Sequence, residues 1–140
     1  MNTNSTPHAV GVNAILPVHD VDRTASFFEK VGFSRDSEVS EDPTDPTTPL
    51  GFVIMKNDVC QLMLQSFKSI QNDAPEMLSG GDTTTLLFII VENLDAVVDA
   101  LDGEPVFLAR RKTFYGAEEI GITSPGGHKI TFAEFGEEAA

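Results

Sequence analysis

The hydrophobic positions of the first half of the chain predict one strand, one helix and three further strands. Residues 10–18 form a mostly apolar run of strand length. After Asp20, which can cap a helix, apolar residues recur at helical spacing as far as Val31, and Gly32 is a helix-stop signal. Three more strand-length runs follow, at residues 33–39, 50–55 and 59–65. The predicted order of the first half is therefore βαβββ.

The second half of the chain repeats this order. Residues 83–91 form another apolar run, after which Asn93 can cap a helix that ends before Gly103. The segment Val18–Asp22 aligns with Val91–Asp95, which makes the repetition explicit. Three strand-length runs again follow, at residues 106–109, 118–123 and 129–135. We therefore expect one domain over residues 10–135, with repeats at 10–66 and 83–135.

The remaining segments have the composition of loops. Residues 67–82 are polar and end in Ser-Gly-Gly, so we expect a linker there, with a possible helical turn at Pro75–Leu78. Residues 1–9 and 136–140 are expected to be tails.

Two such repeats predict an α+β fold with a cupped, incompletely closed mixed sheet and helices outside. A single helix covers only one face of each half-sheet, so the other face either packs on its partner or lines a cavity. In residues 61–65, Gln61, Met63 and Gln65 alternate with aliphatic residues, so a strand here sends amides to one side. Amides in a packed core need partners, which favours a cavity. A ferredoxin-like pair of βαβ units is the competing fold.

Composition narrows the classes of partner. The 140 residues include 22 acidic and 9 basic side chains, for a net charge of −13, which repels phosphate backbones and makes nucleic acid an unexpected partner. No apolar run reaches the roughly 18–20 residues needed to cross a bilayer, and a secretory signal is lacking at the start, so we expect no membrane association and a cytoplasmic location. The single cysteine, Cys60, excludes an intrachain disulfide, and its apolar neighbours predict a buried, inert thiol.

Three stretches carry a family resemblance: LPVHDVDRTASFFEKVGF at 16–33, VENLDAVVDAL at 91–101 and YGAEEIGITSPGGHKITFAEF at 115–135. Together they resemble the glyoxalase/bleomycin-resistance/extradiol-dioxygenase superfamily, the vicinal-oxygen-chelate proteins. The third is most similar to the bleomycin-resistance-like branch, although its turn at 124–127 lacks that branch's aspartate. These stretches contain helix caps, turns and packing residues, so they indicate the fold better than the activity.

The resemblance implies four metal ligands on inward-facing strand positions in the family's metalloenzymes. The matching positions of this chain are Asn13, Gln61, Leu86 and Thr131. None is a histidine, aspartate or glutamate, and such donors are what divalent transition metals require. The histidines lack metal-site spacing and are interpreted as solvent or turn residues; they are His8, His19 and His128. We therefore expect no metal and no other cofactor.

The inward positions combine apolar walls with a few amides and hydroxyls, as small-molecule pockets do. The candidate ligand-binding residues on strands are Asn13, Gln61, Met63, Leu86, Phe88 and Thr131. Phe114 and Tyr115 can stack on a planar ligand, and Glu119 can pair with a cationic one. The alternatives are that these side chains fill the cup, that the loop aromatics cover the core, and that Glu119 lies on a solvated face. No catalytic residue is predicted.

The predicted function is metal-free binding of a small organic molecule, cationic or aromatic, which the protein sequesters or senses. The resemblance also implies a homodimer with cavities near the subunit boundary. One alternative is a metal-dependent lyase or dioxygenase with non-standard ligands. A second is a non-catalytic interaction module with a filled cup. The residues favour binding over catalysis, and enzymatic activity remains open.

Overall fold

The computed structural model describes residues 6–136, so the tails expected at 1–9 and 136–140 lie largely outside the described residues. The elements of the first repeat are β1 (Ile15–Val18), α1 (Val21–Glu29), β2 (Ser34–Ser40), β3 (Leu50–Lys56) and β4 (Gln61–Ser66). The elements of the second are β5 (Leu86–Ile90), α3 (Leu94–Ala100), β6 (Val106–Lys112), β7 (Ala117–Thr123) and β8 (Lys129–Phe135). Between the repeats lie α2 (Phe67–Asp73) and the 3-10 helix η1 (Pro75–Leu78).

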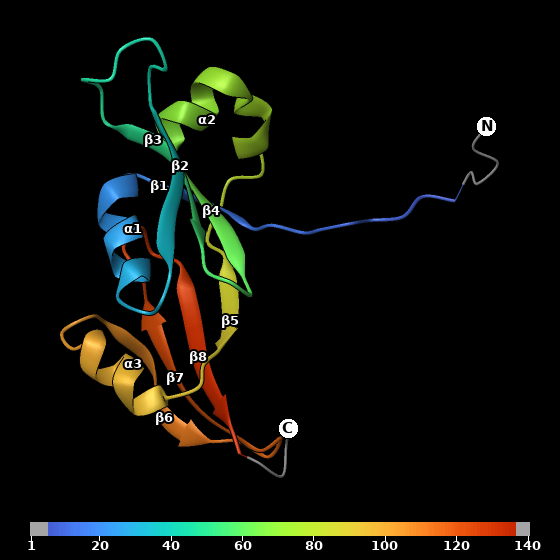
Figure 1. The fold of residues 1–140 in the computed structure, drawn as a ribbon, viewed down its shortest axis with the longest axis vertical. Helices are drawn as coiled ribbons and strands as arrows, with labels where there is room; N and C mark the ends of the chain where they lie inside the picture. Colours follow the sequence, from blue (N-terminus) through green and yellow to red (C-terminus); the bar gives the residue numbers. More distant parts are fainter. Residues whose placement is uncertain (1–5, 137–140) are drawn as a thin grey trace.

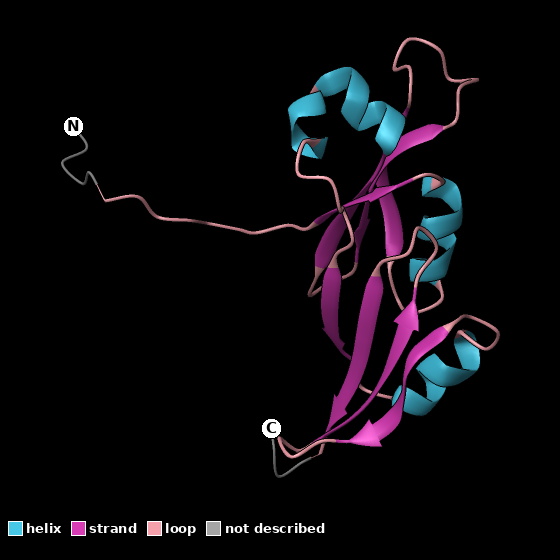
Figure 2. Ribbon diagram, turned by 180° about the vertical axis from the view of Figure 1, so that it is seen from behind, coloured by secondary structure: helices cyan, strands magenta, loops and turns pink. Residues whose placement is uncertain are grey.

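Each repeat forms a four-stranded sheet, which we call module one and module two. The strand orders are β1-β4-β3-β2 and β5-β8-β7-β6, so the two modules share one topology. In each, the first strand pairs in parallel with the fourth, and the other pairs are antiparallel. Helices α1 and α3 lie on the same side of the molecule, whereas α2 lies at one end of module one, in contact with β1, β3 and β4 (Figure 1, Figure 2). The α+β fold of two βαβββ repeats in an unclosed sheet is thus confirmed.

The predicted capping residues determine where the two outer helices begin. The side chain of Asp20 accepts a hydrogen bond from the Arg23 amide at 3.0 Å, and that of Asn93 accepts one from the Ala96 amide at 3.1 Å. Each helix is followed by a glycine with positive φ, 99° at Gly32 and 92° at Gly103. The same local chemistry therefore starts a helix at equivalent points of both repeats, and a glycine follows each helix, two residues earlier in the second repeat.

One continuous hydrophobic core lies beneath both outer helices. Module one contributes residues such as Leu16, Phe28 and Leu64, and module two contributes Leu94 and Phe132 to the same cluster. Because the apolar residues of both sheets and both helices join in one cluster, the modules pack as a single body.

A buried histidine also joins the modules. His128 is 1% exposed and lies immediately before β8. Its Nδ1 accepts a hydrogen bond from the Thr85 amide at 2.9 Å, and its Nε2 lies 2.7 Å from the carbonyl oxygen of Pro17 in module one. A carbonyl only accepts, so Nε2 carries the proton and the ring is the neutral tautomer in this arrangement. His128 is thus a buried connection between the repeats rather than a solvated turn residue.

Three local features differ from the sequence-based expectation. The segment 67–82 contains α2, which Ser66 caps by accepting from the Ser69 amide at 3.0 Å. The expectation that Cys60 is buried is wrong: its thiol is exposed in the β3–β4 turn and donates to Asn57 Oδ1 at 3.3 Å. The strand expected over 10–18 begins only at Ile15, and the chain before it projects from the body (Figure 1).

Within residues 6–136, none of the helices has both the length and the apolar character that crossing a membrane requires.

Candidate functional site

The inner face of module two, opposite α3, leaves large apolar side chains in solvent. Directly opposed residues of a ladder share a face, and β5 places Leu86 opposite Lys129, Phe88 opposite Thr131 and Ile90 opposite Ala133. Leu86 is 78% exposed, Phe88 50% and Ile90 66%. This face is therefore an open apolar surface beside polar groups of β8.

A buried carboxylate lies on the same face. Glu119 on β7 is 1% exposed, and its Oε1 accepts from Nε and Nη2 of Arg111 at 3.0 and 2.8 Å. Its Oε2 accepts from the phenol of Tyr115 at 2.6 Å. Burial raises the pKa of Glu119, but the hydrogen bonds from Tyr115 and Arg111 and the Arg111 charge outweigh it, so the pKa lies below its ordinary value. Glu119 is therefore ionised, and both its oxygens already have partners.

A second polar group lies farther along this face. Lys129 Nζ donates to Thr123 Oγ1 at 3.0 Å and lies 5.5 Å from the centroid of the Phe107 ring. The Phe107 ring packs over Gly121, where an added Cβ would be 2.5 Å from Phe107 Cζ. Irregular register between β6 and β7 brings Phe107 to this side. The glycine thus makes room for an aromatic ring that in turn contacts a lysine.

The inner face of module one, by comparison, carries neutral amides and a charged pair whose charges cancel. Gln61 Nε2 donates to Asn13 Oδ1 at 3.0 Å, and Ile15 lies opposite Met63. The charged pair of this face, Lys56 and Asp36, is mutually satisfied at 3.2 Å. Gln61 and Phe88 both line a pocket of about 340 Å³ where the modules meet.

The repeat symmetry identifies which positions of the two modules correspond. Ile15 faces Met63 in module one, and its counterpart Phe88 faces Thr131 in module two. Thr131 is therefore equivalent to Met63. The equivalent of Gln61 is Lys129, two residues earlier on β8.

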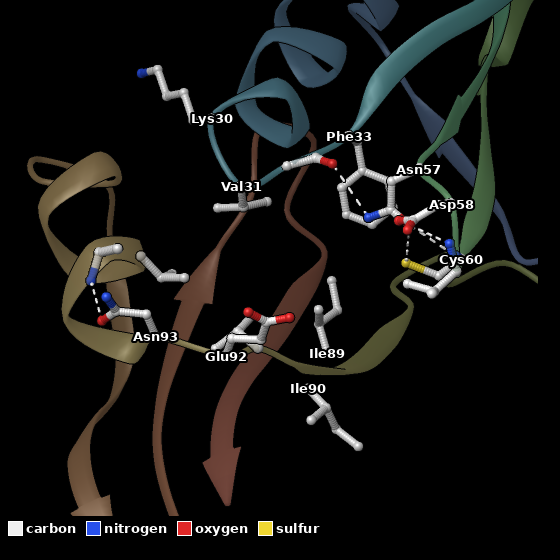
Figure 3. Close-up of a pocket in the computed structure, with 15 residues that line it drawn as sticks. Lys30, Val31, Phe33, Asn57, Asp58, Cys60, Ile89, Ile90, Glu92 and Asn93 are labelled. Atoms are coloured by element: carbon white, nitrogen blue, oxygen red, sulfur yellow. Dashed lines mark hydrogen bonds between the residues drawn. The ribbon is translucent and has the colours of Figure 1, made fainter.

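A further pocket, of about 410 Å³, opens between the modules on the helix side (Figure 3). The end of α1, the β3–β4 turn and the segment from β5 to α3 surround it, and Val31, Ile89 and Glu92 are among its lining residues. In Figure 3 the Lys30 side chain points away from the pocket. The sequence does not predict this pocket because its wall comes from three segments that meet only after the modules dock.

The residues at the implied metal-ligand positions do not fit a metal ion. Asn13 and Gln61 use their amides on each other, and Leu86 has no donor atom. The fourth implied position, Thr131, offers only a neutral hydroxyl. The register of the ladders makes Lys129 the equivalent of Gln61, and its ammonium group repels cations. No group of three His, Cys, Asp or Glu side chains within residues 6–136 is arranged to hold a metal. The absence of a metal cofactor stays a prediction.

The structure brings most of the predicted site residues together in three groups. Tyr115 and Glu119 are hydrogen-bonded, Phe88 and Thr131 are opposed across a ladder, and Asn13 and Gln61 are hydrogen-bonded with Met63 next on β4. Phe114 is fully exposed and makes a T-shaped contact with Tyr115, with centroids 5.2 Å apart. Whether these residues bind a ligand stays a prediction.

The sequence interpretation does not include Arg111, Phe107 and Lys129. Arg111 and Phe107 reach the inner face through the irregular register of β6, which no local pattern signals. Lys129 has a visible signal: alternating polar and apolar residues begin at Gln61 on β4 and at Lys129 on β8.

Comparisons with known proteins agree with this architecture. The family model of the Glyoxalase/Bleomycin resistance protein/Dioxygenase superfamily matches residues 7–132. Among curated proteins, none matches this chain significantly. Lactoylglutathione lyase from Agrobacterium tumefaciens has a similar structure, with a TM-score of 0.65 at 17% identity over 92% of this chain and 96% of that one. TioX from Micromonospora sp. ML1 gives a TM-score of 0.66 at 15% identity, over 91% of this chain and 97% of that one.

A bleomycin-binding protein in complex with bleomycin gives a TM-score of 0.58 at 14% identity, over 91% of this chain and 100% of that one. At these identities, the solved structures bear on the fold alone.

Proposed function

This chain belongs to the Glyoxalase/Bleomycin resistance protein/Dioxygenase superfamily, and we propose that it binds a small organic molecule with aromatic character and sequesters or senses it without a metal ion. The proposed site is the inner face of module two, extended by Asn13, Gln61 and Met63 of module one.

The observation that supports this proposal is the exposure of Leu86, Phe88 and Ile90 on the same sheet face as a hydrogen-bonded polar group. Apolar side chains on a folded surface favour an occupant that removes them from water. The hydrogen bonds among Arg111, Glu119 and Tyr115 fix polar atoms next to them. Apolar area with a few positioned polar groups is the common construction of small-molecule sites. One similar structure is of a protein bound to bleomycin, which is in keeping with binding as the activity.

We propose in addition that two copies associate, with the binding face near the subunit boundary. The projecting segment before β1 exposes Val10 and Val12 almost completely, and the outer edge of β5 has no ladder partner among residues 6–136. A second copy would cover both features. Sedimentation velocity is expected to give a dimer, and a monomer at every concentration would contradict this part of the proposal.

Binding can be tested by thermal-shift screening against aromatic and cationic compounds, followed by titration of the hits. A ligand of the proposed site raises the melting temperature of the wild-type protein. Leu86→Ala should weaken binding, whereas the matched variant Val106→Ala, which removes an exposed aliphatic side chain from the other face, should not. If no compound stabilises the protein, the filled cup of an interaction module is favoured. Stoichiometric zinc, iron, nickel or manganese in the purified protein would favour an enzyme instead.

A further inference from the structure

We propose that the ligand is an aromatic compound that carries a negative charge, such as an aromatic carboxylate, and that Lys129 determines this preference. The inference rests on the proposed function and specifies the charge of the ligand at the same site.

The charges on the inner face of module two do not cancel. Its carboxylate, Glu119, is matched by Arg111, with Nη2 and Oε1 2.8 Å apart. Lys129 lies on the same face, and no carboxylate of residues 6–136 forms an ion pair with it. The face therefore has one more cation than carboxylate, in a chain with a net charge of −13. An anion is favoured locally although the whole protein repels anions.

The other acidic side chains of this sheet lie on the opposite face. Glu118 pairs with Arg110 at 2.8 Å, and Arg110 also pairs with Asp95 of α3. Glu134 Oε1 accepts from the Leu94 amide at the start of α3, at 2.7 Å. These carboxylates are directed toward the helix, so they do not neutralise Lys129.

The carboxylate that a cationic ligand would need here, Glu119, is buried and already accepts three hydrogen bonds. A cationic ligand would have to compete at Glu119 with the charge of Arg111 and the hydroxyl of Tyr115. Lys129, in contrast, holds its ammonium group with one neutral hydroxyl, that of Thr123. A carboxylate forms a stronger, charge-assisted hydrogen bond with an ammonium group than a hydroxyl does.

The aromatic part of the ligand has a place next to Lys129. Thr131 is the next inward residue on β8, about 6.6 Å along the strand, and it lies opposite the exposed Phe88. On the other side, Phe107 covers Gly121, which lies opposite Thr131 on β7. A planar ring placed over Thr131 would contact both aromatic side chains while its acid group reaches Lys129.

The charge preference belongs to module two alone. The position of module one that is equivalent to Lys129 is Gln61, a neutral amide bonded to Asn13. The repeat thus offers the same backbone geometry with and without the cation.

Three naphthalene probes of nearly equal shape test the proposal: 2-naphthoate, 2-naphthamide and 2-naphthylmethylammonium, each titrated into the full chain by calorimetry. We expect the anion to bind about tenfold more tightly than the amide, and the cation to bind most weakly. Lys129→Gln should lower the affinity for the anion about tenfold and leave that for the amide unchanged. Lys129→Arg should keep the preference. The control variant Lys112→Gln makes the same change in net charge on the other face of the sheet. It should alter neither the affinity for the anion nor that for the amide.

Three outcomes would overturn the charge assignment. Equal binding of the three probes would show that the site has no preference for an anion. An anion preference that survives Lys129→Gln would show that Lys129 does not cause it. Either result leaves the proposed function intact. If none of the probes binds while another compound from the screen does, the inference fails and the proposed function stands. The proposed function itself fails if the whole screen gives no ligand or if the purified protein holds a stoichiometric metal ion.

Discussion

The phenol of Tyr115 donates a hydrogen bond of 2.6 Å to Oε2 of Glu119, linking the loop after β6 to the middle of β7. The chain reverses between them at Gly116, whose φ of 88° suits a glycine. Tyr115 is the one tyrosine of the chain, and the chain has no tryptophan. Absorbance from its phenol therefore reports on this hydrogen bond without interference.

Alkaline titration of this absorbance should give a midpoint above the ordinary tyrosine value of about 10. The hydrogen bond to Glu119, burial and the Glu119 charge raise the pKa of Tyr115. Because the folded pKa is raised, this interaction contributes stability at lower pH that is lost as pH rises through the folded pKa. Glu119→Gln should move the midpoint down toward the value of the unfolded chain. An unchanged midpoint in that variant would contradict the hydrogen bond.

Lowering the pH should weaken the interactions of Glu119 with Tyr115 and Arg111, because it protonates the carboxylate. The pKa of Glu119 is lowered from its ordinary value of 4.5, so its stabilising effect is complete above that value and is lost as pH falls through the folded pKa. At neutral pH, Glu119→Gln should reduce the free energy of unfolding in urea by about 2 kcal/mol. The difference from wild type should shrink as pH falls below the ordinary value. A constant difference at all pH values would show that the charge is not responsible.

Removing the imidazole of His128, which hydrogen-bonds to both modules, should lower the free energy of unfolding. His128→Ala leaves a cavity and removes the partners of the half-buried Pro17 carbonyl and Thr85 amide, so we expect a loss of about 3 kcal/mol in the free energy of unfolding. His19→Ala is the control, since His19 is exposed and its ring makes a tilted contact with that of Phe67, with centroids 4.6 Å apart. Similar small losses in both variants would argue against a structural role for His128.

A methyl group at residue 121 should displace an aromatic ring. The added Cβ of Gly121→Ala would lie 2.5 Å from Phe107 Cζ and 2.7 Å from Leu108 Cβ, so the variant should lose about 1–3 kcal/mol of stability. The double variant with Phe107→Ala should be less destabilised than the sum of the single variants, because the main clash is gone. The losses are measured by urea unfolding. If the loss of the double variant equals the sum of the two single losses, the clash with Phe107 is not the source of the strain.

Local patterns in the sequence are enough to predict much of the fold. Asp20 and Asn93 cap helices as expected, and the strand predicted over 129–135 matches β8. The helix α2 is not predicted because only Ile70 of its residues is buried, which leaves no apolar periodicity to detect. Cys60 is wrongly predicted to be buried because its apolar neighbours resemble a strand, whereas Asn57 holds it in a turn.

The candidate site is less predictable than the fold. The alternation at Gln61 and Met63 correctly assigns side chains to one face of β4, because a strand has a fixed period of two. The partners of Glu119 depend instead on how β6 aligns with β7, and two irregularities in that ladder determine the alignment. Such shifts arise from packing between strands, so the sequence alone gives no account of Arg111 or Phe107 at this face.

The shared core beneath the helices has a thermodynamic consequence. Residues of both repeats belong to one apolar cluster, and His128 of the second repeat hydrogen-bonds to Pro17 of the first. Unfolding of either repeat would therefore expose the apolar residues of the other to water. Heat is therefore expected to unfold the two repeats in one cooperative transition, with equal calorimetric and van't Hoff enthalpies. The repeated halves, although alike in topology, would behave as a single thermodynamic unit.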